Sequence, residues 1–381
     1  MFVLAIVPLL LPALLVGTQV QSAGPVDASS RLWALTTDDS LAGAVVGVRG
    51  GPPWSASLLA HTDGGRLLRR FGRSLFAVNA GAGTIRRVAI AGGQVQDYDL
   101  GPGSEPQDVH VPPALLFPPL AYVTRRHAPF LLELDLATGA SHDVVDLSPV
   151  GGGAPIALGT MERDGSRLFV QVRVEDGAEV PGGARGVLAV VDLVQQALID
   201  VDPLAPGIQG IALQGAPPRF KMQLVSGTRT LFVSTTESFL DARGGIERVD
   251  VDQLASLGFA LTEEVGGSDM GGFVMTSPEE GYYVFHTDLL ASTHLKHFRV
   301  PNAPDPGLEI VVLLNDTVDV IAHDPARRAV FLPSGFAWGT PGLYMVSTRT
   351  NQVVGPPIDT LLRPHDVIVG PRARGLEGAR L

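Results

Sequence analysis

An all-β fold, in which seven four-stranded sheets form a ring, is predicted by three features of this 381-residue sequence. A short pattern recurs seven times: an apolar–aromatic pair that begins one strand, a polar turn, and then a second strand. The copies are spaced by roughly 43 to 63 residues, the size of a four-stranded propeller blade. No helical periodicity appears after residue 23, whereas 45 Gly and 30 Pro provide many turns. The sequence therefore predicts a seven-bladed β-propeller.

Residues 2–17 form the one long apolar run, and its 16 residues are fewer than the roughly 20 needed to span a bilayer. Small residues follow it, which is typical of a signal peptide over residues 1–23, cleaved after Ser22 or Ala23. The basic residues that usually begin such a peptide are missing, since none precedes Arg31. An uncleaved interfacial anchor is the alternative. We expect an exported mature protein without a membrane span, located in the periplasm, at the cell surface or in the medium.

The seven copies of the pattern are each marked by one aromatic anchor residue on a middle strand of a blade. In chain order the anchors are Trp33, Phe76, Tyr122, Phe169, Phe232, Tyr283 and Phe331. A second strand with period-two alternation follows most of them and often ends in Val-Asp or Leu-Asp. In the fourth unit, residues 175–185 lengthen this connection, so we expect a surface insertion there.

Innermost strands are predicted at residues 107–111, 155–161, 220–225, 271–276 and 320–325. The chain begins at a middle strand, so the first blade lacks an inner strand of its own. The C-terminal segment RPHDVIVGP matches the inner-strand segment EPQDVHVPP in pattern. We therefore predict that residues 364–369 return to complete the first blade, which removes the open sheet edges. The propeller would span residues 24–370, followed by a flexible tail at 371–381.

Four segments, EPQDV, AYVTRR, LLELDLATG and HDVIVGP, carry a family resemblance. They resemble YVTN-type seven-bladed propellers, whose repeat has Tyr-Val-Thr on one strand and Asp-x-x-Thr-Gly after the next. Over residues 72–370 the order of features is more similar to exported bacterial YVTN/NHL-like (YncE-like) proteins, a group without an established activity. The resemblance implies the fold and export, and a repeat motif of this kind carries little information on function.

Carboxylates repeat at one predicted mouth of the axial channel. Asp108 and Asp366 occupy matching positions at the start of inner strands, and Asp319 lies one step off in register. With Gln107 and His365 they would form an oxygen-rich ligand site, and the three aspartates are candidate ligands for a hard cation such as calcium. The alternative is that these aspartates are turn-forming residues repeated for structural reasons.

Histidines are the other candidate ligands. His61, His110 and His323 are expected on or near inner strands, where they could line the axis or be ordinary core histidines. His294 and His297 share a face only on a helix, and on the strand predicted here they point to opposite faces.

Charge and composition limit the function. Lys and Arg number 28 against 39 Asp and Glu, and the net charge of −11 disfavours nucleic acid as a partner. Cysteine is absent, which excludes thiolate chemistry and disulfides. Lysine occurs only as Lys221 and Lys296, so phosphate chemistry is expected to have few cationic groups.

No G-x-S-x-G, Walker or dinucleotide-binding signature is present. We therefore favour a monomeric binding or interaction module for a protein or a small molecule over an enzyme. Two alternatives stay open: a lactonase-like hydrolase that uses a divalent cation in the channel, and a subunit that partners a redox protein.

Overall fold

The computed structural model describes residues 32–38, 42–49, 54–113, 119–175, 183–225, 227–236, 243–266, 269–287, 292–300, 309–314, 319–335 and 341–370. The expected signal peptide, the expected tail at 371–381 and most of the expected insertion at 175–185 lie outside these ranges.

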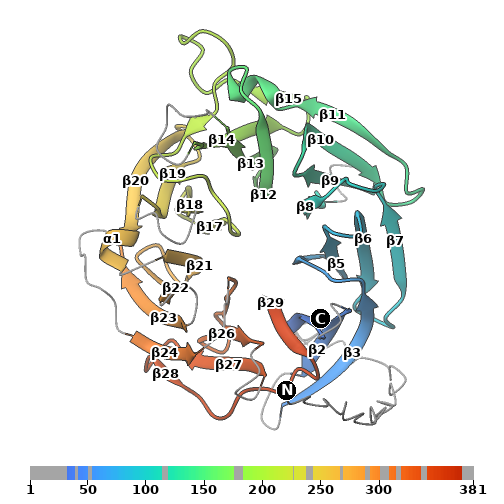
Figure 1. Ribbon diagram of the computed structural model, residues 1–381, viewed down its shortest axis with the longest axis vertical. Helices are drawn as coiled ribbons and strands as arrows, with labels where there is room; N and C mark the ends of the chain where they lie inside the picture. The colour runs from blue at the N-terminus through green and yellow to red at the C-terminus, as the bar shows by residue number, and fades with distance from the viewer. Residues whose placement is uncertain are drawn as a thin grey trace, which may run out of the picture.

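Seven antiparallel sheets surround a central axis and form a closed ring (Figure 1). This arrangement confirms the predicted seven-bladed β-propeller with four-stranded blades. From the axis outward, blades one to three consist of β29 (Arg363–Val369), β1 (Leu32–Thr37), β2 (Gly43–Arg49) and β3 (Ser55–Thr62); β4 (Leu67–Phe71), β5 (Ser74–Asn79), β6 (Thr84–Ala89) and β7 (Val95–Asp99); and β8 (Pro106–His110), β9 (Leu120–Arg125), β10 (Ala128–Asp135) and β11 (Ser141–Asp146). Blades four and five consist of β12 (Ile156–Asp164), β13 (Arg167–Val174), β14 (Arg185–Asp192) and β15 (Ala197–Ile199); and β17 (Gln223–Val225), β18 (Thr230–Thr235), β19 (Gly245–Asp250) and β20 (Ala255–Thr262). Blades six and seven consist of β21 (Asp269–Met275), β22 (Glu280–Thr287), β23 (Ser292–Arg299) and β24 (Glu309–Leu314); and β25 (Ala322–Asp324), β26 (Ala329–Ser334), β27 (Gly342–Ser347) and β28 (Gln352–Val353).

Two short helical turns accompany the strands, the 3-10 turn η1 (Ser148–Gly151) and α1 (Glu263–Gly266). Within the described ranges, no helix has the length and apolar character that crossing a membrane requires.

The C-terminal strand closes the ring, as predicted. β29 pairs antiparallel with β1, with Leu32 opposite Val369 and Trp33 opposite Ile368. In Figure 1 the red β29 lies beside the blue strands of the first blade. The first blade is therefore built from both ends of the propeller, and β1 is paired on both sides, with β29 and with β2.

The anchor residues lie on the second strand of every blade and are at most 2% exposed. Seven clusters of buried side chains fill the molecule, one at each contact between neighbouring blades. Phe76 of blade two packs with Val123 of blade three, for example, and Phe331 of blade seven packs with Ala34 of blade one. Because each middle strand is covered on both faces, a single blade cannot bury its apolar surface alone.

The repeated aspartate at the end of the third strand has a local role. Asp135 Oδ1 accepts hydrogen bonds from the backbone N–H groups of Ala137 (2.7 Å) and Thr138 (3.1 Å). Asp192 and Asp250 make the same pair of bonds two and three residues ahead. Each turn then needs a positive φ, which Gly139 adopts at 79°. The aspartates of the Val-Asp and Leu-Asp endings therefore stabilise the turns that follow these strands.

Three details differ from the sequence-based expectation. His61 lies on β3, the outermost strand of blade one, because the turn that follows it leads to the next blade. Blade four has a fifth, two-residue strand, β16 (Ile211–Ala212), which pairs with β14. The inner strand β4, with the sequence LLRRF, was not recognised because two arginines interrupt its apolar pattern.

Removal of residues 363–381 should lower the melting temperature strongly and reduce the free energy of unfolding by several kcal/mol. The truncation deletes a whole strand ladder together with its buried apolar side chains. Removal of residues 371–381 alone is the control and should leave the melting temperature almost unchanged. Equal melting of the two truncated proteins in a calorimeter would contradict ring closure by β29.

Candidate functional site: a cationic channel mouth

One end of the axial channel opens into a cavity of about 710 Å³. The inner strands begin at this end, so the residues just before β4, β17 and β25 lie in its wall. Leu158, Pro217, Phe220 and Val320 supply apolar surface. A cavity of this size and mixed lining can hold a small organic molecule.

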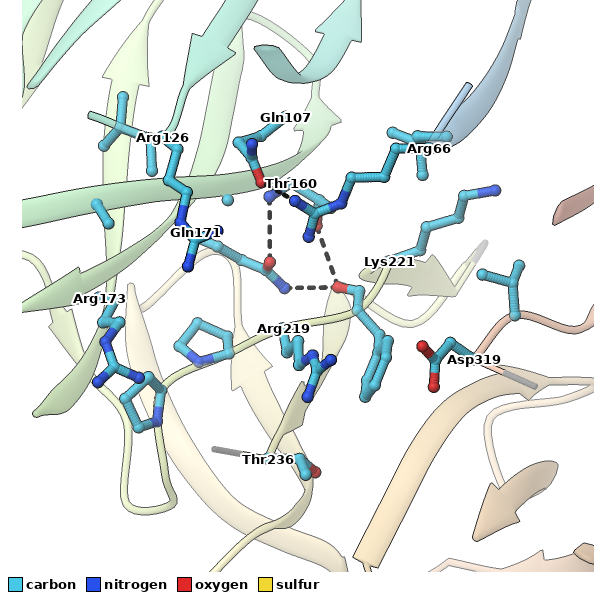
Figure 2. Close-up of a pocket in the computed structure, with 18 of the residues that line it drawn as sticks. Arg66, Gln107, Arg126, Thr160, Gln171, Arg173, Arg219, Lys221, Thr236 and Asp319 are labelled. Atoms are coloured by element: carbon cyan, nitrogen blue, oxygen red, sulfur yellow. Dashed lines mark hydrogen bonds between the residues drawn. The ribbon is translucent and has the colours of Figure 1, made fainter. Parts of the chain in front are cut away.

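Five basic side chains line this cavity, and they come from four successive blades. Arg66 precedes β4, Arg126 lies in the β9–β10 turn, Arg173 is on β13, and Arg219 and Lys221 precede β17. Figure 2 shows the four arginines arranged around the cavity. In a chain with a net charge of −11, this concentration of positive charge is a local feature of one channel mouth.

The arginines repel one another. Burial lowers the pKa of Arg66 below its ordinary value, and the charges of Arg126 and Arg219 lower it further. Asp319 acts in the opposite direction. Within the described ranges, neither Arg66 nor Arg126 forms an ion pair with a carboxylate. A bound anion would relieve this repulsion.

Hydrogen bonds fix the floor of the cavity. The Gln171 side chain accepts a hydrogen bond from the Thr160 N–H (3.1 Å) and donates one to the Phe220 carbonyl (2.8 Å). The Thr160 hydroxyl donates to the same carbonyl (3.1 Å), as Figure 2 shows. Arg66 donates to the Gln107 Oε1 atom. These bonds join blades two and three and blades four and five, and they order the cavity before any ligand arrives.

The predicted carboxylates Asp108 and Asp366 do not line this cavity but lie beside Arg69 and Lys221, and we call this group of four residues the waist. Both are fully buried, and each forms an ion pair: Asp108 with Arg69 (2.5 Å) and Asp366 with Lys221 (2.7 Å). Burial lowers the pKa of Lys221, while the charge of Asp366 opposes this effect.

Each waist aspartate also joins two blades. Asp108 Oδ2 accepts the Met161 N–H of blade four (2.7 Å), and Asp366 Oδ2 accepts the Leu68 N–H of blade two (2.7 Å). The waist carboxylates are therefore engaged in structural contacts.

The other predicted site residues lie at the mouth itself. Gln107, His365 and Asp319 all line the cavity, and their role as ligand-binding residues stays a prediction. Burial lowers the pKa of His365, which favours its neutral form. Within the described ranges, no group of three or more His, Asp and Glu side chains could hold a metal ion. The calcium site and the cation-dependent hydrolase stay predictions.

A second cavity, of about 420 Å³, lies at the opposite end of the channel. His110 and His323 line it, which confirms their predicted place on inner strands. Burial lowers the pKa of His110 to about 3, with a smaller contribution from Arg163. Burial raises the pKa of Glu162 to about 7, against the effect of Arg69. Lys221 lines both cavities, so the waist separates them.

The basic residues of the mouth were missed at the sequence level. The scarcity of lysine indicated few groups for binding phosphate, yet arginines supply four of the five cations. Arg173 lies on β13, whereas the other three arginines lie in turns or just before a strand, so their positions differ from blade to blade. A signal in the sequence was the basic pair that ends the segment YVTRR, whose last residue, Arg126, lies in the turn after β9.

No protein-family model and no curated protein matches this sequence. Among solved structures, a protein from Lactobacillus plantarum matches with a TM-score of 0.52 and 14% identity, over 89% of this chain and 98% of that chain. The WD40 repeats of RRP9 match with a TM-score of 0.50 and 8% identity, over 91% and 98%. A prolyl endopeptidase matches with a TM-score of 0.51 and 10% identity, over 87% and 49%.

These likenesses show the propeller fold. A repeat domain and a peptidase share it, so the fold leaves the function open. The resemblance to YVTN/NHL-like proteins stays a prediction.

Asp366→Asn should reduce the free energy of unfolding by about 3 kcal/mol, because the partly buried ammonium group of Lys221 would lose its charged partner. Adding Lys221→Met should recover part of this loss, since the unpaired charge is then removed. Chemical denaturation of the single and double variants gives the coupling. Asp97→Asn, which breaks the exposed Arg86–Asp97 pair, is the control and should cost under about 1 kcal/mol. A waist variant as stable as the control would contradict the structural role.

Proposed function

We propose that this propeller binds a small organic anion at the cationic mouth of its channel and acts as an exported binding module in the periplasm or at the cell surface. The observation that carries the proposal is the convergence of four arginines on a single cavity; Lys221 also lines it but is already paired with Asp366. Guanidinium groups form paired hydrogen bonds with carboxylate or phosphate oxygens, so this residue type suits an anionic group.

The cavity wall supports an organic ligand over an inorganic ion. Phe220 and the adjacent Pro217 and Pro218 line the cavity, and its volume of about 710 Å³ exceeds what one phosphate or sulfate fills. Apolar surface next to the arginines would contact a carbon skeleton and strengthen the ion pairs by excluding water.

Export is supported by the sequence. The apolar run at 2–17 and the small residues after it have the order of a cleavable signal. A binding protein outside the cytoplasm would meet organic ions directly in its surroundings.

Arg66→Gln and Arg126→Gln should each weaken the binding of carboxylates by about tenfold, since each removes a charge-assisted hydrogen bond. The probes are straight-chain carboxylates and dicarboxylates of three to eight carbons, measured by isothermal titration calorimetry at low and high salt. Affinity should fall as salt rises. Arg299→Gln is the matched control, because Arg299 is 72% exposed on blade six, away from the cavity. Failure of every probe to bind, or equal loss in the control, would refute the proposal.

Expression with export should yield a mature protein whose N-terminal sequence begins at Ala23 or Gly24. Edman sequencing or intact mass of the exported fraction measures this. Intact Met1 in the soluble exported fraction would contradict cleavage.

A further inference from the structure

The geometry points to a zwitterionic ligand: an organic molecule whose carboxylate meets the arginines and whose ammonium group meets Asp319. This inference rests on the proposed function and assigns the ligand class of the same site. It starts from Asp319, the one carboxylate among the described residues that line the cavity.

Asp319 is placed to receive a cation. It precedes β25 in blade seven, while the five basic side chains belong to blades two to five. Figure 2 shows it across the cavity from Arg126 and Arg173. Its side chain is 38% exposed, so it can be reached from the cavity.

The carboxylate is incompletely satisfied within the described part of the chain. Asp319 Oδ1 is buried and accepts no hydrogen bond there. Among the described residues, His286 Nε2 lies 3.5 Å from Oδ1, and it is a charged partner only when that histidine is protonated. Because Oδ1 is buried, a ligand ammonium group would meet the exposed part of the Asp319 side chain, at the edge of the cavity opposite Arg126 and Arg173.

The arginines on one side of the cavity and Asp319 on the other also disfavour ligands that carry only negative charges. A dianion that spans the cavity would bring its second carboxylate near Asp319, where like charges repel. A molecule with one anionic and one cationic end satisfies both sides, and its carbon chain lies along the apolar wall that includes Phe220 and Val320. The cavity therefore discriminates by charge pattern as well as by size.

The test compares ω-aminoalkanoates of four to eight carbons with the unsubstituted alkanoates of the same length, by calorimetry on the full-length mature protein. For the best-fitting length, the amino compound should bind the wild type about tenfold more tightly than its alkanoate. Asp319→Asn should abolish this difference while leaving the alkanoate bound at least as tightly. Asp97→Asn is the control and should preserve the wild-type difference.

The outcomes separate the two proposals. Alkanoates that bind through Arg66 and Arg126 without any advantage for the amino compounds would overturn the zwitterion and leave the anion site standing. An advantage that survives in Asp319→Asn would also overturn it. Absence of binding for both series would overturn the anion site, and the zwitterion with it. Circular dichroism of each variant establishes that it is folded.

Discussion

The ring depends on side chains that cross from one innermost strand to the next. In the described part of the chain, neighbouring blades share no backbone ladder, so apolar packing and crossing side chains join them. Asp366 accepts the Leu68 N–H, Asp108 accepts the Met161 N–H, and Gln223 both accepts from and donates to the backbone of Met275 (2.7 and 3.0 Å). These short bonds hold the inner strands at a fixed spacing, and the channel diameter and its lining follow from that spacing.

Two of these connections use carboxylates, and buried carboxylates need compensation. Arg69 and Lys221 supply it at the waist. The charges at the waist are paired with each other, whereas the arginines nearer the solvent have fewer acidic neighbours. The cavity at the channel mouth is therefore positively charged, because the fold pairs the waist charges with each other and leaves Arg66 and Arg126 of the mouth for a ligand.

The fold could be predicted because each blade repeats the same sequence pattern. Each blade is marked by an aromatic anchor, and several are also marked by a turn aspartate. The match between the terminal segment and EPQDVHVPP indicates the same repeating blade. The site could be predicted only in part, because its residues do not recur at equivalent positions in the seven blades. The sequence placed Asp108 on an inner strand. Its partner Arg69 lies on β4, whose sequence LLRRF does not have the apolar pattern of the other inner strands. Arg66 and Arg219 meet only when blades two and five close around the axis.

Closure of the first blade by β29 also affects how the molecule folds. Strand β1 is among the first parts of the propeller in the chain and its partner is the last, so their pairing has the greatest sequence separation in the structure. Contacts of this kind form late, because a long loop must be ordered before they give any stability. Once formed, they remove the free ends from which a linear array of repeats would unravel. The propeller should consequently fold slowly and unfold as one cooperative unit.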